Sequence, residues 1–230
     1  PIHNSLDTTG SFALTCYNNP SNLTVHRVNA DGTVGAQVEQ TGKLDLGIFA
    51  HQILPTPQNR SVIMITRGNR PENGKPEDPG ALNIYKFDSG RLSPLATLAV
   101  GGKGGLGYGP RHLDFHPTQP WVYVSVESQN ELHMHKLEGD TLSPEPLFKK
   151  HTTLEAYAID FPQAAGGIHV HPNGRTVYVS NRANATVDFN GKKVFRGGEN
   201  SIAVFSIDPA TGEPALVQSA DPQSYHVRTF

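Results

Sequence analysis

The strongest constraint on the fold of this chain is a sequence pattern that recurs four times. Segments 2–18, 51–67, 111–127 and 166–182 each contain a short strand, a turn rich in Pro, Gly, Asn or Thr, and a second strand of the V-x-V-x type. Their aligned starts are separated by 49, 60 and 55 residues. Self-similarity at a period of this size is typical of repeat folds, in which each repeat is one supersecondary unit.

A third strand and a weaker fourth strand follow each of these segments. The third strands read NLTVHRV, ALNIYKF, ELHMHKL and SIAVFSI, and the fourth strands include PLATLAV and PALVQSA. Four short strands per unit, joined by turns, indicate an all-β chain that folds as a β-propeller of four-stranded blades.

We expect one propeller domain over residues 1–230, and we expect it to be incomplete. The predicted blades cover approximately 1–48, 49–108, 109–163 and 164–223, and residues 224–230 open a further blade. About four and a fraction blades do not close a ring of the usual size, and an open ring would leave exposed edge strands. The chain is therefore interpreted as a fragment, or as a part that another chain completes.

Composition excludes several classes of partner. The formal net charge of −2 gives no electrostatic footprint for nucleic acid or for an anionic membrane. No apolar run approaches the ~20 residues of a membrane-spanning helix. The single cysteine, Cys16, forms no internal disulfide and is expected on a core strand. No signal peptide is visible, and we expect a cytoplasmic location. Because the chain starts at Pro1 and not at a methionine, the alternative that a precursor carried a signal peptide stays open.

Charged residues recur at two equivalent places of the repeat. In a blade the first strand lines the central channel and the second strand runs back antiparallel to it, so the start of the first and the end of the second lie at the same rim. These two places are 16 residues apart in all four units. The charged residues found there are His51, Arg67, Arg111, Glu127, Arg182 and, in the opening of the fifth unit, Arg228.

An excess of arginine over carboxylate at one rim predicts a site for an anion. The guanidinium fork binds phosphate or carboxylate in a bidentate manner, and a glutamate or histidine beside it supplies an acid or base. His112 and His169 lie near the same rim and are secondary candidates for substrate contact. The inserts 68–80 and 183–199 follow second strands and are expected to rise from this rim. The alternative is that Glu127 and its arginines are only structural ion pairs between blades.

Three other patterns are set aside. GKGGLG at 102–107 fits a dinucleotide fingerprint, but a strand entry follows it where a helix is required. The pairs His133/His135 and His169/His171 lack a third ligand at fixed spacing, so we predict no metal and no cofactor. The mid-strand serines have no G-x-S-x-G elbow. His116 and His171 are expected to cap the turns that they precede.

Several of these motifs resemble a known family. The segments GPRHLDFHP…WVYVSVE, IHVHPNGRTVYVSNR and NSIAVFSIDPATGE resemble the lactonase-type seven-bladed propellers, which include bacterial 6-phosphogluconolactonases and fungal carboxy-cis,cis-muconate cyclases. The resemblance runs over nearly the whole chain. It implies a channel site built from one histidine, one glutamate and two arginines, which match His51, Glu127, Arg111 and Arg182. The pair Gly166-Gly167 departs from the family pattern, where polar residues are expected, and Arg67 stands at a position that varies in the family.

The resemblance implies hydrolysis of a small anionic sugar lactone, such as 6-phosphogluconolactone. Arg111 and Arg182, with Arg67 and Arg228, would hold the anion or the developing oxyanion, and either His51 or Glu127 would deprotonate water. The same residues suit a cycloisomerase of the muconate cyclase type. A third reading, from a different class, is a non-catalytic propeller that binds a ligand or a partner at this rim. The oligomeric state is left open.

Overall fold

Every regular element in the part of the chain that the structure describes is a β-strand. The structure is a computed structural model that describes residues 1–155 and 163–230. No helix able to cross a membrane is found among those residues. Two compact units are distinguished, one of residues 1–110 and 137–145 and the other of residues 111–136 and 146–230. The predicted all-β fold is confirmed.

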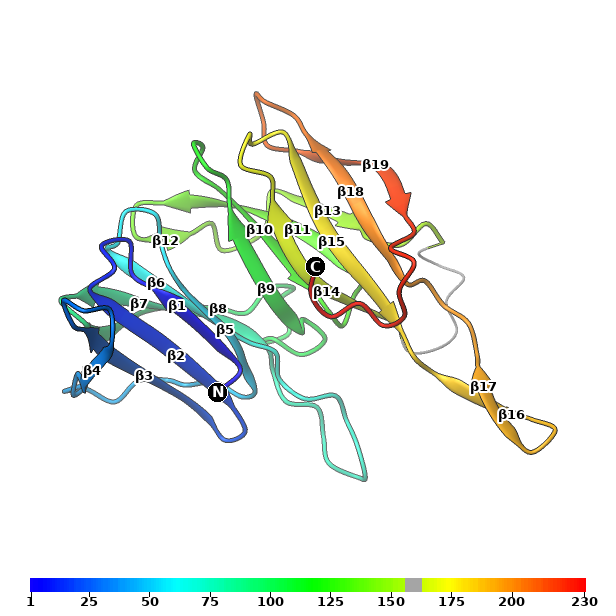
Figure 1. Cartoon of the computed structure of the whole chain (residues 1–230), viewed down its shortest axis with the longest axis horizontal. Coiled ribbons are helices and arrows are strands. Elements are labelled where there is room, and N and C mark those ends of the chain that lie inside the picture. The colour runs from blue at the N-terminus through cyan, green and yellow to red at the C-terminus, as the bar shows by residue number, and fades with distance from the viewer. Residues whose placement is uncertain (156–162) are drawn as a thin grey trace. The chain divides into compact units, whose positions relative to one another are not determined.

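The first unit carries two four-stranded antiparallel sheets, and each is built in chain order as predicted for a blade (Figure 1). The strands of the first sheet are β1 (His3–Leu6), β2 (Phe12–Asn18), β3 (Ser21–Val28) and β4 (Val34–Gln37). Those of the second sheet are β5 (Ala50–Pro55), β6 (Ser61–Thr66), β7 (Ala81–Asp88) and β8 (Arg91–Leu98). A short strand, β12 (Thr141–Leu142), pairs with Leu137 and Glu138 at the end of β11 (Glu131–Glu138).

The second unit carries two further sheets and a separate hairpin. One sheet contains β9 (Pro110–Phe115, of which Pro110 counts with the first unit), β10 (Trp121–Val126), β11 (Glu131–Glu138) and β13 (Phe148–His151). The other contains β14 (Gln163–Val170), β15 (Thr176–Ala183), β18 (Ser201–Ile207) and β19 (Pro214–Ala220). The predicted insert 183–199 forms the hairpin β16 (Thr186–Phe189) and β17 (Lys192–Phe195), which projects from its sheet in Figure 1.

Two details of this unit differ from the sequence prediction. The fourth segment does not begin at Gly166, because β14 starts three residues earlier at Gln163 and contains a register shift between Ala165 and Ile168. In the third segment two short strands, β12 and β13, pair with β11 where one fourth strand was expected. The last part of the predicted blade 109–163, residues 156–162, lies outside the described residues.

Apolar side chains fill the space between the two sheets of each unit. In β2 they alternate with half-exposed residues, as expected for one buried face, whereas every residue of β6 and β10 is buried. Cys16 lies in the core of the first unit, and burial raises the pKa of its thiol to about 12, so it behaves as a small core residue. The core of the second unit consists of Trp121, Tyr123, Leu132, Met134, Ala165, Ile168, Val177, Val179, Ala203, Phe205 and Ile207.

The histidines at the hairpin turns act as predicted. Nδ1 of His116 accepts hydrogen bonds from the backbone N–H groups of Thr118 (3.2 Å) and Gln119 (3.0 Å). Nδ1 of His171 accepts one from Asn173 at 3.2 Å. Nε2 of His116 also lies 2.9 Å from the carbonyl oxygen of Gly174, so this ring joins the β9–β10 turn to the β14–β15 turn.

A buried tyrosine joins the same two sheets, and its hydroxyl offers a test of their packing. Tyr123 donates to the carbonyl oxygen of Gly212 at 2.8 Å. Replacing Tyr123 by Phe should lower the free energy of unfolding by about 1 kcal/mol, because a buried acceptor loses its donor. Tyr178→Phe on β15, a half-buried residue, should change it by less than about 0.5 kcal/mol. Chemical denaturation of both variants measures the difference, and equal values would contradict this packing.

Candidate functional site

Two neighbouring strands of the second unit bring Arg111 and Glu127 together. Arg111 is the second residue of β9, and Glu127 directly follows the last residue of β10. Because β9 and β10 are adjacent and joined by one turn, the start of the first lies beside the end of the second. Arg182 stands near the end of β15, where it pairs with Ala164 of β14. The 16-residue separation that recurs in the sequence is therefore the separation between two residues, Arg111 and Glu127, whose side chains are in contact.

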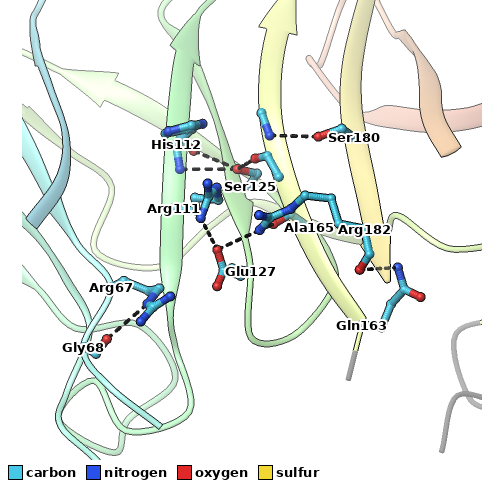
Figure 2. A network of polar contacts seen from close by, with 12 residues as sticks. Arg67, Gly68, Arg111, His112, Ser125, Glu127, Gln163, Ala165, Ser180 and Arg182 are labelled. Atoms are coloured by element: carbon cyan, nitrogen blue, oxygen red, sulfur yellow. Dashed lines mark hydrogen bonds and ion pairs between the residues drawn. The ribbon is translucent and has the colours of Figure 1, made fainter. Parts of the chain in front are cut away.

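These three side chains form one ion-paired group, which we call the Arg–Glu–Arg cluster (Figure 2). Oε2 of Glu127 accepts hydrogen bonds from Nη1 of Arg111 and, at 2.9 Å, from Nη2 of Arg182. Nη2 of Arg182 also donates to the carbonyl oxygen of Ala165 at 3.0 Å. All three residues are buried, with 4%, 8% and 3% of Arg111, Glu127 and Arg182 exposed. One buried carboxylate is thus paired with two guanidinium groups that are also buried.

The charge of this cluster is unbalanced in favour of cations. Burial lowers the pKa of Arg111 to about 10, and the charge of Glu127 opposes that effect. The neighbouring charges of Arg182 and Arg228 lower the same pKa further. Arg111 still carries its proton at neutral pH, and its buried Nε has no hydrogen-bond partner among the described residues. A second anion near the cluster would therefore be stabilised by groups already held in place.

The departure at Gly166-Gly167 has a physical reason. A Cβ atom at Gly166 would lie 2.3 Å from Oγ of Ser180 and 3.0 Å from Nε of Arg182, so only glycine lets the arginine lie against this strand. The register shift of β14 falls at this pair. Two mid-strand serines satisfy its backbone: Ser125 donates to the carbonyl oxygen of Gly166 at 2.8 Å, and Ser180 accepts from the N–H of Gly167 at 3.0 Å. The hydrogen bonds of these serines thus stabilise the bulge in β14 against which the Arg182 side chain packs.

The start of the fifth unit lies beside the same cluster. The carbonyl oxygen of Arg228, an exposed residue, lies 3.6 Å from the position that a Cβ atom would take at Gly167, and the charge of Arg228 lowers the pKa of Arg111. The backbone of His226 is joined through Asn200 to Ala183, the residue after Arg182. Burial, and then the charges of Arg182, Arg228 and Arg111, lower the pKa of its imidazole. Sequence comparison of the units identified Arg228 and missed His226. The only signal for His226 is its place two residues before that arginine, where the third unit has Gly109.

The remaining predicted residues are found in other contacts. The backbone N–H of His112 lies 3.3 Å from Oγ of Ser125, and the ring of His169 packs edge-on against Phe230 with centroids 5.0 Å apart. Their contact with a substrate stays a prediction.

His51 and Arg67 belong to the first unit. His51 is 5% exposed and lies at a register shift of β5. The guanidinium of Arg67 stacks on Phe49 at 4.0 Å, and its Nε donates to the carbonyl oxygen of Gly68 at 3.2 Å. A common site of these residues with the Arg–Glu–Arg cluster also stays a prediction.

The histidine pair on β11 has a different environment. His133 and His135 are fully buried, and Nε2 of His133 lies 2.7 Å from Oε2 of Glu131. Within residues 1–155 and 163–230, no three His, Cys, Asp or Glu side chains gather in a way that could hold a metal ion.

Comparison with known proteins gives one consistent family. The family model described as lactonase, 7-bladed beta-propeller, matches residues 1–230. The chain is 28% identical to the 6-phosphogluconolactonase of Bacillus subtilis, over 100% of this chain and 59% of that protein. It is also 28% identical to the 6-phosphogluconolactonase of Pectobacterium carotovorum, over 100% of this chain and 66% of that protein. The chain thus spans about three fifths of the length of the relatives that it matches.

Solved structures show the same fold. A protein from Lactobacillus plantarum superposes with a TM-score of 0.73 at 21% identity, over 100% of this chain and 60% of that one. A structure described as the periplasmic gluconolactonase of Pseudomonas aeruginosa superposes with a TM-score of 0.72 at 18% identity, over 100% of this chain and 59% of that one. The fold predicted from the repeat is confirmed by these neighbours.

The glycine under Arg182 supplies a test of the local geometry. Gly166→Ala should lower the free energy of unfolding by about 1–3 kcal/mol, because the added methyl overlaps the Ser180 hydroxyl and the Arg182 side chain. Gly167→Ala is a matched control, since a Cβ there would find its nearest heavy atom at 3.6 Å. Denaturant unfolding of both variants distinguishes them. Equal losses would show that Arg182 does not lie against Gly166.

Proposed function

Because this chain belongs to the lactonase family of seven-bladed β-propellers, we propose that the whole protein hydrolyses a sugar lactone, with 6-phosphogluconolactone as the leading substrate. The observation that carries this proposal is the buried Arg–Glu–Arg cluster with its excess positive charge. A sugar lactone that bears a phosphoryl group offers such a site two features, an anionic group and a carbonyl that becomes an oxyanion during hydrolysis.

The reaction needs a stabilised oxyanion and a route for one proton. Attack of water forms a C–O bond to the lactone carbonyl carbon, and the carbonyl electron pair moves onto its oxygen. Arg111 and Arg182 are fixed by Glu127, so their guanidinium groups meet that charge without reorganisation. Collapse of this intermediate breaks the ring C–O bond, and the departing ring oxygen takes up the proton that the water lost. The product is the open hydroxy acid.

Two residues are candidates for the base that receives the proton from water. Glu127 touches both arginines of the cluster, and those guanidinium groups stabilise its charged form, which weakens it as a proton acceptor. His51 is the other candidate, carried over from the family pattern. A variant of Glu127 therefore separates a role in proton transfer from a role in holding the arginines.

The cellular location is proposed on the same basis. We keep the cytoplasm as the expected compartment, in line with the metabolic role that the names of the bacterial relatives suggest. The Pseudomonas aeruginosa neighbour is described as periplasmic, so the periplasm is the alternative compartment.

Replacement of Glu127 by Gln tests the proposed activity. The rate of lactone opening, corrected for spontaneous hydrolysis, should fall by about 10²–10⁴-fold, because the variant loses the carboxylate that orients both arginines and any base that it provides. Phosphorylated and plain gluconolactone are measured side by side. Two buried guanidinium groups lose their counter-ion, so stability should also fall by about 3–5 kcal/mol and folding is checked by circular dichroism.

Glu138→Gln is the matched control. This glutamate lies exposed at the end of β11 and should leave the rate within about twofold of the wild type. Unchanged turnover in folded Glu127→Gln would remove Glu127 from the reaction. Absence of turnover of both lactones in the wild-type protein would contradict the lactonase proposal. The muconate-type cycloisomerisation would then be measured next, and failure there would leave the ligand-binding propeller.

A further inference from the structure

Three side chains fix the last described segment of the chain to the second unit. The ring of Tyr225 packs edge-on against Phe195 of β17, with centroids 5.2 Å apart. Val227 is buried, and the ring of Phe230 packs against His169. Between these anchors stand His226 and Arg228.

Asn200 holds the backbone of this segment to the strand that carries Arg182. Its Oδ1 accepts the N–H of His226 at 3.0 Å and the N–H of Ala183 at 3.1 Å, and its Nδ2 donates to the carbonyl oxygen of Ala183 at 3.1 Å. The carbonyl oxygen of Arg182 itself accepts a hydrogen bond from Gln163 at 3.1 Å. The positions of His226 and Arg182 are therefore fixed relative to each other through one amide side chain.

His226 adopts a left-handed backbone conformation. Its φ is 54°, in the left-handed region that non-glycine residues rarely occupy. Such conformations cost on the order of 1 kcal/mol, persist only where the surroundings impose them, and cluster at functional sites. Here the hydrogen bond to Asn200 and the aromatic anchor at Tyr225 impose it.

The charges around His226 favour an anionic ligand. The guanidinium groups of Arg111, Arg182 and Arg228 lower the pKa of its imidazole, and among the described residues the carboxylate of Glu127 opposes them. No ion pair with a carboxylate is found for Arg228 among the described residues. The buried Nδ1 atom of His226 also has no hydrogen-bond partner within residues 1–155 and 163–230.

We propose that His226 and Arg228 bind a doubly charged oxyanion beside the Arg–Glu–Arg cluster, and that His226 takes up a proton when the anion binds. In the lactonase that we propose above, this anion is the phosphoryl group of the substrate, and only that identity rests on the proposed function. The protonated imidazole then donates a hydrogen bond to the anion, while Arg111 and Arg182 remain available to the lactone carbonyl.

The direction of the pH dependence follows from the charges. Without anion, burial and the three arginines lower the pKa of His226, so it is neutral at pH 7. A bound dianion raises that pKa. Anion affinity should therefore increase as the pH falls from 8, by at most about tenfold per pH unit, and level off once the free histidine is protonated. Arg111 keeps its charge over this range, and the ring of His169 contacts the segment at Phe230.

Calorimetric titration of the whole protein with sulfate, from pH 8 to pH 5.5, tests this proposal. Sulfate is the probe because it stays a dianion throughout. His226→Asn removes the imidazole and keeps a residue that tolerates left-handed backbone. His171→Asn is the matched control, because His171 is exposed in the turn at the far end of β14.

The wild type and His171→Asn should bind sulfate more tightly as the pH falls, with net proton uptake measured in buffers of different ionisation enthalpy. His226→Asn should bind with an affinity that varies less than about twofold over the same range. Asn200→Ala should lose the proton linkage more than the affinity, because it frees His226 and leaves the arginines. A wild-type affinity that does not change with pH, or a pH dependence that persists in His226→Asn, would overturn the proposal.

The same variant separates this proposal from the lactonase activity. KM for phosphorylated gluconolactone should rise about tenfold or more in His226→Asn, whereas KM for plain gluconolactone should stay within about twofold. Proton-linked sulfate binding in a protein that opens neither lactone would support this anion site and refute the proposed reaction. Lactone turnover in which His226→Asn changes KM equally for both substrates would support the proposed reaction and refute this anion site.

Discussion

The paired hydrogen bonds from Arg111 and Arg182 to one oxygen of Glu127 determine much of the surrounding structure. Two buried cations around one buried anion tolerate little displacement, since each ion lost from such a group leaves another without compensation. Gly166 allows Arg182 to lie against β14. Ser125 and Ser180 bind the backbone that the bulge frees. Gln163 binds the carbonyl oxygen of Arg182, and Asn200 binds the backbone of the next residue, Ala183. These residues are explained by the position of Arg182.

The strands that present the charged residues are anchored by apolar packing. β10 is buried along its whole length, and the core of the second unit joins Trp121 and Tyr123 to Phe205. Burial of this kind keeps β9, β10 and β15 in fixed register, so that charges at their ends meet at reproducible positions. The buried cluster lowers the free energy of unfolding that this packing provides, because the mutual attraction of three ions only partly offsets the free energy of desolvating them.

The repeat made most of the fold and part of the site predictable from the sequence. The period of the repeat, its strand pattern and its turn residues together define a four-stranded unit. Because the second strand of the unit runs back antiparallel to the first, Arg111 and Glu127, which are 16 residues apart, come into contact. The bulge of β14 was not predictable, because a one-residue shift depends on which side chain fits over Gly166. His226 was missed because its place depends on a tertiary contact with Asn200 rather than on the repeat. The two strands that pair with β11 also reflect local packing that the pattern does not encode.

We propose that the Arg–Glu–Arg cluster serves chemistry on an anionic substrate and is not required for folding. The most direct measurement replaces all three charges at once by apolar residues of similar volume, as Arg111→Met, Glu127→Leu and Arg182→Met, and compares stability with lactone turnover. We expect a folded protein that is at least as stable as the wild type, because replacing buried ion groups by apolar residues is often neutral or stabilising, and we expect lactone turnover to be lost. A triple variant that keeps wild-type turnover per folded molecule, or that unfolds, would contradict it.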